Sequence, residues 1–344
     1  MTDPQPAYQH FVGIDVSKLT LDVCLLQDAG KEKHLLEVSN DEEAFGALIR
    51  WLAGHKADPH QTIACLENTG LYDDRLLEAI TLAGYPCALE KTTILAKVRP
   101  EHHRKGDDFD AALLAEYAFR YRDKLCLWEA QEPVIEEIRL LYSERRRLLT
   151  QRQATLQLQG EAPRRTADTR FAEALWHEQR AFFDRQIACL EEKLDELVRS
   201  DDDIFRLYQI MKSLPGFGQV ASLLWTMLFY GKGRLDARKI ASRFGFAPHV
   251  KVSGTSLHSP ARSSGHGMPE VRKVLTLCAR SAAAHDEKLR AYKEKKLAEG
   301  KPSKLITNNV INKLIRMASA MWNEGTLYEP SHVSRFTKQS ALST

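Results

Sequence analysis

The sequence lacks the features that mark zinc-binding, disulfide-bonded or membrane proteins. Its six cysteines are scattered and include no Cys-X-X-Cys pair, which argues against a zinc site and a disulfide scaffold. No stretch approaches the roughly 18 apolar residues of a membrane helix, and the nearest candidate, residues 220–230, is typical of a buried helix. The first ten residues contain neither a basic nor an apolar segment, so we expect no signal peptide. These absences favour a reduced, cytosolic protein with no membrane partner.

Charge is abundant but nearly balanced. Charged residues make up 28% of the 344 residues, and the net charge of +3 predicts no partner by itself. Its distribution is more informative, because residues 231–300 contain 15 Lys and Arg against 6 Asp and Glu. A basic segment of this kind is typical of nucleic-acid-binding regions. The length suggests two or three domains.

Strand and helix patterns alternate over the first 130 residues, which predicts an α/β domain with partly parallel strands. The apolar residues of 11–26 indicate a β-hairpin, and those of 62–66 indicate a strand that ends at Glu67. The remaining elements are a helix over 41–54, a helix over 71–84 that ends at Gly84, a strand over 85–90 and a helix from 106.

A different pattern follows from about residue 131 to residue 200. Phe183, Ile187, Leu190, Leu194 and Leu197 repeat at the spacing of a coiled-coil seam. A break at residues 160–163 predicts two long helices folded into a hairpin, which could serve as a spacer or as a dimerisation arm. From residue 204 a third unit begins, and its segment "SLPGFGQVAS" (213–222) resembles the glycine turn of a helix-hairpin-helix.

Four acidic residues of the first unit are candidates for a catalytic site. Asp15 and Glu67 stand at or near the ends of predicted strands, and Asp107 and Asp110 lie three residues apart at a helix start. Taken singly, each has an ordinary structural explanation as a turn residue, a strand-end cap or a helix N-terminal acid. Together they would repel one another unless cations neutralise them, and oxygen ligands favour Mg²⁺.

The segment "APHVKVSGTSLHSPARSSGHG" (247–267) is the second candidate site. Its hydroxyl and basic side chains suit phosphate binding, and Arg262 could clamp a phosphate with two hydrogen bonds. Ser253 precedes Gly254 and could be a nucleophile if a base or metal activates it. A flexible polar loop is the simpler reading, and the spacing does not choose among the five serines of the segment.

Seven short motifs resemble, in order, those of the insertion-sequence one-ten family of DEDD transposases, which are described as bridge-RNA-guided DNA recombinases. The matching motifs are "GIDVSK" (13–18), "CLENTG" (65–70), "KGDDFDAALLAEY" (105–117), "LPGFG" (214–218), "RFGFAP" (243–248), "VSGTS" (252–256) and "ARSSGHGMPEVRKVL" (261–275). Each motif is modest, but the ordered set is specific and covers most of residues 11–285.

The resemblance implies three domains. They are an RNase-H-like (RuvC-like) α/β domain over 1–130, a coiled-coil helical hairpin over 131–203 and a mainly α-helical transposase domain over 204–344. The family's DEDD acids correspond to Asp15, Glu67, Asp107 and Asp110, which would hold Mg²⁺. Its catalytic serine corresponds to Ser253, which would form a covalent phosphoserine link with a cleaved DNA strand.

The resemblance also implies partners. A structured non-coding bridge RNA of the element would pair with double-stranded target and donor DNA, and the composite site would form between subunits of a dimer or tetramer in the bacterial cytosol, associated with the nucleoid. Three departures affect the motifs: Gly106 replaces a usual Thr, Asp108 stands where Arg or another residue is common, and a usual Lys is missing after Arg262. His266 or Lys251 could substitute for that Lys. The predicted nucleic-acid contacts are Lys251, Arg262, His266, Gly216, Gly218, Arg272 and Lys273.

Three other readings stay open. A RuvC-like endonuclease would use water as the nucleophile and would form no covalent adduct. A sugar-kinase-like ATPase would share the "GIDVSK" motif, but the chain has no second Asp-Gly phosphate loop and no Gly-rich adenosine motif. A catalytically silent nucleic-acid-binding protein would not require the complete acid set.

Overall fold

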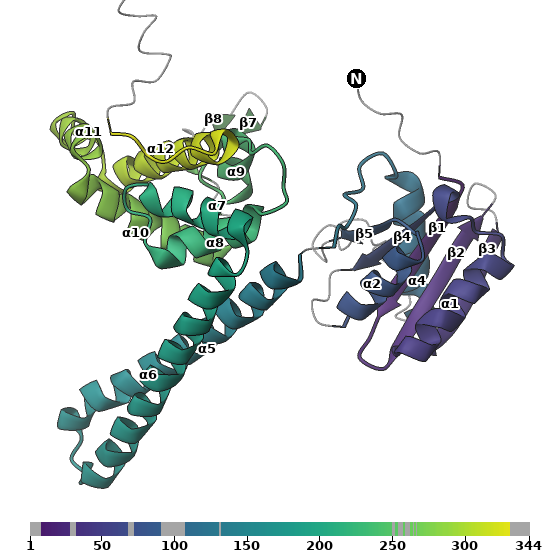
Figure 1. Ribbon diagram of the computed structural model, residues 1–344, viewed down its shortest axis with the longest axis horizontal. Coiled ribbons are helices and arrows are strands. Elements are labelled where there is room, and N and C mark those ends of the chain that lie inside the picture. The colour runs from purple at the N-terminus through teal and green to yellow at the C-terminus, as the bar shows by residue number, and fades with distance from the viewer. Residues whose placement is uncertain are drawn as a thin grey trace, which may run out of the picture. The chain divides into compact units, whose positions relative to one another are not determined.

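The computed structural model describes residues 8–27, 32–67, 72–90, 107–130, 132–249, 252–253, 257–258, 262–263, 265 and 267–330. The chain divides into two compact units, Met1–Ala130 and Gln131–Thr344 (Figure 1). Within the described ranges, no helix is both long enough and apolar enough to cross a membrane.

The first unit alternates strands and helices, as the sequence predicts. Its elements are β1 (His10–Val16), β2 (Thr20–Gln27), β3 (Glu32–Ser39), α1 (Glu42–Gly54), β4 (Thr62–Glu67), α2 (Asp74–Leu82), β5 (Cys87–Glu90) and α4 (Asp107–Arg120). Asp41 caps α1 by accepting a hydrogen bond of 2.9 Å from the Ala44 backbone N–H. Gly84 follows α2 at a φ of +89°, a left-handed conformation that favours glycine.

The five strands of the first unit form one mixed sheet in the order β3-β2-β1-β4-β5. The neighbours β1–β2 and β2–β3 pair antiparallel, whereas β4 pairs parallel with both β1 and β5. This order and these directions are those of an RNase-H-like sheet, in agreement with the predicted fold class. The strand β3 has no counterpart among the elements predicted from the sequence, because its half-exposed, charged sequence gives a weak apolar signal.

Helices cover both faces of this sheet (Figure 1). On one face α1 and α2 bury Leu48, Leu77 and Ile80 against strand residues that include Ile14 and Leu66. On the other face α4 covers a separate apolar cluster, which contains Phe11, Cys24, Leu26, Ile63, Cys65, Ala111, Leu114, Ala115, Tyr117 and Ala118. Because side chains alternate along a strand, residues two apart in β1, such as Gly13 and Asp15, lie on the same face as Phe11.

Gly13 allows α4 to pack directly on β1. A Cβ atom at this position would lie 2.0 Å from the Ala111 carbonyl oxygen and 2.3 Å from the Ala115 backbone nitrogen. Any side chain would therefore push the helix away from the sheet. The rings of Phe11 and Phe119 meet edge to face with their centroids 5.2 Å apart, so α4 runs antiparallel to β1. Residues of β1 beyond Gly13 therefore lie level with the first turn of α4.

The second unit begins with a helical hairpin made of α5 (Pro133–Glu161) and α6 (Arg170–Arg199). The ion pairs Arg145–Glu191 (2.6 Å) and Arg152–Asp184 (3.1 Å) join the two helices. The paired positions move seven residues in opposite directions, which shows an antiparallel arrangement. In α6 the predicted seam residues Ile187, Leu194 and Leu197 are buried. The two long helices are confirmed, whereas a coiled coil in the strict sense stays a prediction.

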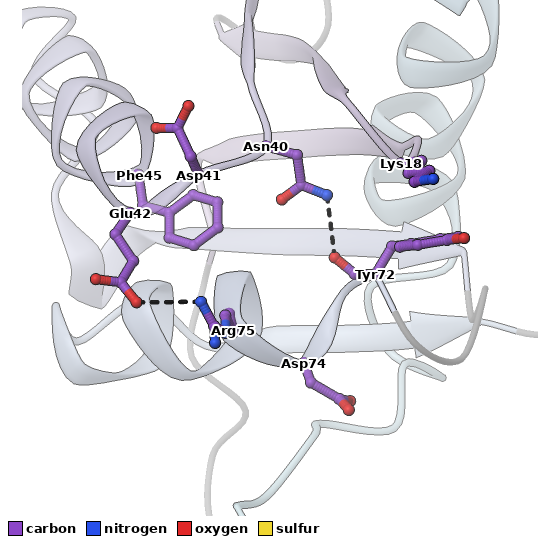
Figure 2. Close-up of a pocket in the computed structure, with 8 residues that line it drawn as sticks. All are labelled: Lys18, Asn40, Asp41, Glu42, Phe45, Tyr72, Asp74 and Arg75. Atoms are coloured by element: carbon purple, nitrogen blue, oxygen red, sulfur yellow. Dashed lines mark hydrogen bonds and ion pairs between the residues drawn. The ribbon is translucent and has the colours of Figure 1, made fainter.

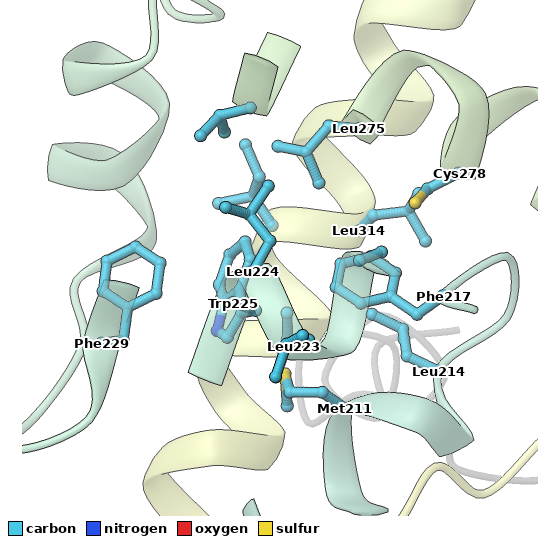
Figure 3. Close-up of a cluster of buried hydrophobic side chains, with 14 of the residues drawn as sticks. Met211, Leu214, Phe217, Leu223, Leu224, Trp225, Phe229, Leu275, Cys278 and Leu314 are labelled. Atoms are coloured by element: carbon cyan, nitrogen blue, oxygen red, sulfur yellow. The ribbon is translucent and has the colours of Figure 1, made fainter. Parts of the chain in front are cut away.

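The remaining helices pack around α8 (Gln219–Phe229). They are α7 (Asp202–Ser213), α9 (Ala237–Arg243), α10 (Pro269–His285), α11 (Glu287–Ala298) and α12 (Ser303–Glu324). Eight of the eleven residues of α8 are buried, and its Trp225 contacts Phe217 and Phe229 with ring centroids 5.9 and 4.8 Å apart (Figure 3). A helix that is apolar all round belongs at the centre of a domain. The base of the α5–α6 hairpin belongs to the same core through Ile138 and Val198.

We predict that Gly13→Ala destabilises the protein by about 3 kcal/mol, because α4 must move away from β1. Gly54→Ala is the matched control, since a Cβ atom there would meet nothing within 4 Å; its effect should stay within about 0.5 kcal/mol. Denaturant unfolding of the full chain, followed by circular dichroism, measures both. Equal stability of the two variants would show that α4 does not depend on this contact.

Candidate active site

Asp15 and Glu67 lie side by side at one edge of the sheet. Asp15 is the next-to-last residue of β1, and Glu67 is the last residue of β4. The parallel register pairs Gly13 with Cys65 and Ile14 with Leu66, so Glu67 follows in line with Asp15. Both residues are partly exposed and lie on the face that α4 covers. The structure therefore brings these two predicted acids together.

The first turn of α4 approaches the same edge. Because α4 runs antiparallel to β1 and contacts Gly13 through Ala111 and Ala115, its start lies level with Asp15. Asp110 is partly exposed and directly precedes Ala111. The backbone of Asp107 begins the helix one turn before Ala111. The start of α4, which carries Asp107 and Asp110, thus lies at the same sheet edge as Asp15 and Glu67.

Two further acids, which the sequence reasoning missed, belong to this edge. Asp22 of β2 is the direct register partner of Asp15, and Glu90 of β5 is the register partner of Glu67. Both are buried, with exposed fractions of 6% and 8%. Register partners lie on the same face of a sheet, so both acids share the face of α4. A signal existed in the sequence, because an acid in an apolar strand is as unusual at Asp22 and Glu90 as at Asp15.

The negative charge of Glu90 affects the pKa of two residues in the apolar cluster under α4. Burial raises the pKa of the Cys65 thiol far above its usual value, and the negative charge of Glu90 raises it further. Burial also raises the pKa of Tyr117, and Glu90 adds to that shift. Both groups are therefore held neutral at physiological pH. The acids at this edge lie next to the neutral, apolar cluster under α4. Charges interact more strongly beside such a low-dielectric region, so the attraction of the acids for a cation increases.

The donor set fits a hard divalent cation. Carboxylate oxygens are the ligands that Mg²⁺ prefers, and the edge presents carboxylates from four neighbouring strands and one helix. Among the residues whose side chains are described, a group that excludes Asp107, no three His, Cys, Asp or Glu already stand close enough to hold a metal ion. The backbone positions thus fit the cation, whereas the described side chains do not form a closed site.

A cavity of about 680 Å³ opens on the other side of the same sheet edge. It is lined by Lys18, Asn40, Asp41, Glu42, Phe45, Tyr72, Asp74 and Arg75, which come from the β1–β2 turn and from the starts of α1 and α2 (Figure 2). Asn40 fixes this edge by donating hydrogen bonds to the carbonyl oxygens of Ser17 (2.8 Å) and Tyr72 (3.2 Å). The half-exposed Tyr72 ring and Lys18 offer a stacking surface and a positive charge in this cavity.

The predicted serine lies on a short hairpin of the second unit. Ser253 ends β7 (Val252–Ser253), whose partner β8 (Leu257–His258) runs antiparallel with Ser253 opposite Leu257. A second pair, β6 (Pro248–His249) with β9 (Arg262–Ser263), closes the base of this segment. The sequence predicts only a polar loop here, because two-residue strands carry no periodic signal.

The predicted nucleic-acid contacts have different surroundings. Gly216 has a φ of +80°, and a Cβ atom there would lie 2.2 Å from the Cys278 carbonyl oxygen, so close packing against α10 explains this glycine without a ligand. Arg272 donates hydrogen bonds to the carbonyl oxygens of Phe244 and Gly245, both 3.0 Å. Lys273 is exposed on α10, and Gly218 is the N-cap of α8. Lys251 and His266 lie outside the described residues.

Comparisons with known proteins agree on one class. Residues 12–159 match a family described as a DEDD transposase of insertion sequence IS110, and residues 208–294 match the transposase IS116/IS110/IS902 family. The chain is 24% identical to a pilin gene-inverting protein of Moraxella bovis over 90% of this chain and 95% of that protein. It is 29% identical over 154 residues to an uncharacterized IS110 protein of Streptomyces coelicolor, covering 44% of this chain and 35% of that protein.

Among solved structures, a Thermus thermophilus RuvC, solved in complex with a Holliday junction substrate, is similar with a TM-score of 0.27 and 13% identity. The match covers 35% of this chain and all of the RuvC chain.

The acid-bearing sheet edge and the two matched regions define a DNA transposase or recombinase. More specifically, the chain belongs to the IS110 family of transposases, as its motifs indicate.

We predict that Asp22→Asn weakens Mn²⁺ binding roughly tenfold, because it removes a buried negative charge directly beside Asp15. Glu37→Gln is the matched control, since Glu37 is the exposed register partner of Asp22 one strand further from Asp15. Isothermal titration of both variants with Mn²⁺ tests this. Affinity at the wild-type level for Asp22→Asn would assign Asp22 to structure alone.

Proposed function

We propose that this protein cleaves and rejoins strands of target and donor DNA through a covalent phosphoserine intermediate, guided by a structured RNA of its own element. The observation that carries this proposal is the convergence of Asp15, Glu67 and the start of α4 at one sheet edge, in a chain whose transposase-family regions also include Ser253. The acids alone would suffice for a nuclease that activates water. The serine would in addition form a phosphoserine ester with the cleaved strand, which preserves the energy of the broken phosphodiester bond for rejoining.

In this proposal Asp15, Glu67, Asp107 and Asp110 hold Mg²⁺, which would supply positive charge beside the reacting phosphate. The partial exposure of Asp15, Glu67 and Asp110 leaves this edge open to a DNA strand. Asp22 and Glu90 are buried behind the edge and add negative charge that favours cation binding.

The Ser253 hydroxyl is the proposed nucleophile. Its oxygen forms a new ester bond to phosphorus while a P–O bond of the DNA backbone breaks, and the hydroxyl proton passes to solvent or a base as the released strand gains a hydroxyl end. A hydroxyl end of the other DNA then attacks the phosphoserine and restores the serine. One phosphodiester is exchanged for another, so no external energy source is needed.

The basic residues of the second unit are compatible with binding to an RNA guide. The basic residues of the second unit suit the phosphate backbone of nucleic acid, which is common to all sequences, while base pairing by an RNA would select the target and donor sites. Binding dominated by phosphate contacts weakens steeply as salt rises.

Subunit association would bring acids and serine of different chains together. The α5–α6 hairpin exposes apolar side chains along α6, with exposed fractions of 79% at Phe171 and 48% at Phe182. Such residues on a long amphipathic hairpin suit a contact with a second copy, and they support a dimer that pairs into a tetramer on DNA.

We predict that Ser253→Ala lowers the yield of the covalent protein–DNA adduct by at least about a thousandfold, because the nucleophile is removed. Ser256→Ala is the control and should form the adduct normally. Full-length proteins, the element RNA, labelled target DNA and Mg²⁺ are resolved on a denaturing gel. Cleavage without an adduct, equal in wild type and Ser253→Ala, would instead establish a RuvC-like nuclease that uses water.

Asp15→Asn should abolish Mg²⁺-dependent cleavage while leaving the free energy of unfolding unchanged or higher. Removing one of several neighbouring carboxylates relieves repulsion in the metal-free protein. Cleavage assays and thermal unfolding without metal measure the two effects separately. A variant that unfolds at markedly lower temperature would make Asp15 a structural residue.

A further inference from the structure

A large groove in the second unit lies next to the predicted serine segment and is lined mainly by residues outside it. It lies between α10, α11 and α12, has a volume of about 1380 Å³, and reaches Phe246, Pro248 and Ser263 at one side. Pro248 and Ser263 are register partners at the base of the segment that carries Ser253. The groove therefore borders the segment of the proposed nucleophile.

The charge of the groove has one sign. Six basic residues line it and no Asp or Glu does, the six being Arg272, Arg280, Lys293, Lys304, Lys313 and Arg316. In the part of the chain that the structure describes, none of these six forms an ion pair with a carboxylate. Uncompensated cations that face one cavity from three helices repel one another, so an anionic ligand would stabilise the arrangement.

Lys313 lies close to a second cation, Arg316, at this groove. Its ammonium lies 4.5 Å from the centroid of the Tyr292 ring, which holds it at the groove. Burial lowers the pKa of Lys313, and the neighbouring charge of Arg316 lowers it further. A negative charge beside Lys313 would raise its pKa and so counteract both effects.

Neutral donors add to the cations. The first turn of α12 lines the groove at Ser303 and Lys304, and no side chain caps this helix. The positive end of the α12 dipole therefore adds to the positive potential of the groove. Asn308 and Asn312 each donate a 3.2 Å hydrogen bond to the Phe246 carbonyl oxygen, which fixes α12 against the loop that leads to β6.

The extent of the groove fits a polymer better than a single anion. Its basic lining along α12 runs from Lys304 to Arg316, which corresponds to about 18 Å at about 1.5 Å per residue. A nucleic-acid strand carries several phosphates over this length. A free phosphate or a nucleotide would neutralise only part of the lining.

We propose that the groove between α10, α11 and α12 binds the phosphate backbone of a nucleic-acid strand next to the segment that carries Ser253. This inference rests on the proposed function, because it assumes a nucleic-acid substrate, and it adds a site made mainly of residues outside the sequence motifs. RNA and DNA share the backbone chemistry, so the experiment includes both.

The test uses the full chain with Lys293, Lys304 and Arg316 each changed to Glu. The control changes Lys288, Lys295 and Lys301 to Glu, which alters the net charge equally at exposed positions of the same region that do not line the groove. Fluorescence anisotropy measures binding of the labelled element RNA and, separately, labelled target DNA over a salt series. A Lys304→Gln/Arg316→Gln variant provides a milder change, and circular dichroism checks the fold of each protein.

We expect the groove variant to bind at least one of the two nucleic acids 30-fold or more weaker than the control, with the salt slope reduced by roughly two to three. The glutamine variant should fall between. Loss with RNA alone or DNA alone supports the groove and identifies its strand. Equal affinity of groove and control variants for both polymers overturns it. Binding requires no cleavage, so a wild type that forms no phosphoserine adduct would refute the proposed chemistry and leave this result standing.

Discussion

The contact between α4 and β1 at Gly13 is the constraint on which the acidic edge depends. A hydrogen atom in place of a side chain lets the backbone of α4 approach the sheet at Ala111 and Ala115. This approach sets the height of the helix over the strand, and the antiparallel direction then places the helix start beside Asp15. A larger residue at Gly13 would displace Asp110 together with the helix. The geometry of a candidate metal site is thus set by a packing contact two residues away from the first acid.

The same edge brings several carboxylates close together, and their mutual repulsion lowers the stability of the sheet. Asp22, Asp15, Glu67 and Glu90 occupy consecutive strands in register, and like charges at such positions destabilise a sheet. Partial exposure lowers this cost for Asp15 and Glu67, whereas Asp22 and Glu90 are buried. In the proposed function, a cation bound at this edge would offset the repulsion among these carboxylates.

The second unit is organised around a buried helix. Its central helix α8 is buried on all sides, and this rigid core supports the short strands that carry Ser253 and the basic groove beside them. The aromatic contacts of Trp225 with Phe217 and Phe229 connect the turn before α8 to its end. Negative charge gathers at the sheet edge of the first unit and positive charge at the groove of the second.

The sequence by itself determined the alternation of strands and helices, the long hairpin and the family, because apolar periodicity and ordered motifs are local signals. It also predicted Asp15, Glu67, Asp107 and Asp110 as site residues, and their positions at element ends follow from that pattern. It did not predict β3, whose edge position leaves little apolar pattern, or the short strands around Ser253. Only the tertiary structure decided that Asp22 and Glu90 join the acids, because strand order and register bring together residues that are far apart in the chain. The basic groove is likewise a tertiary feature, since its lysines and arginines come from three helices and acquire a common direction only when these helices pack.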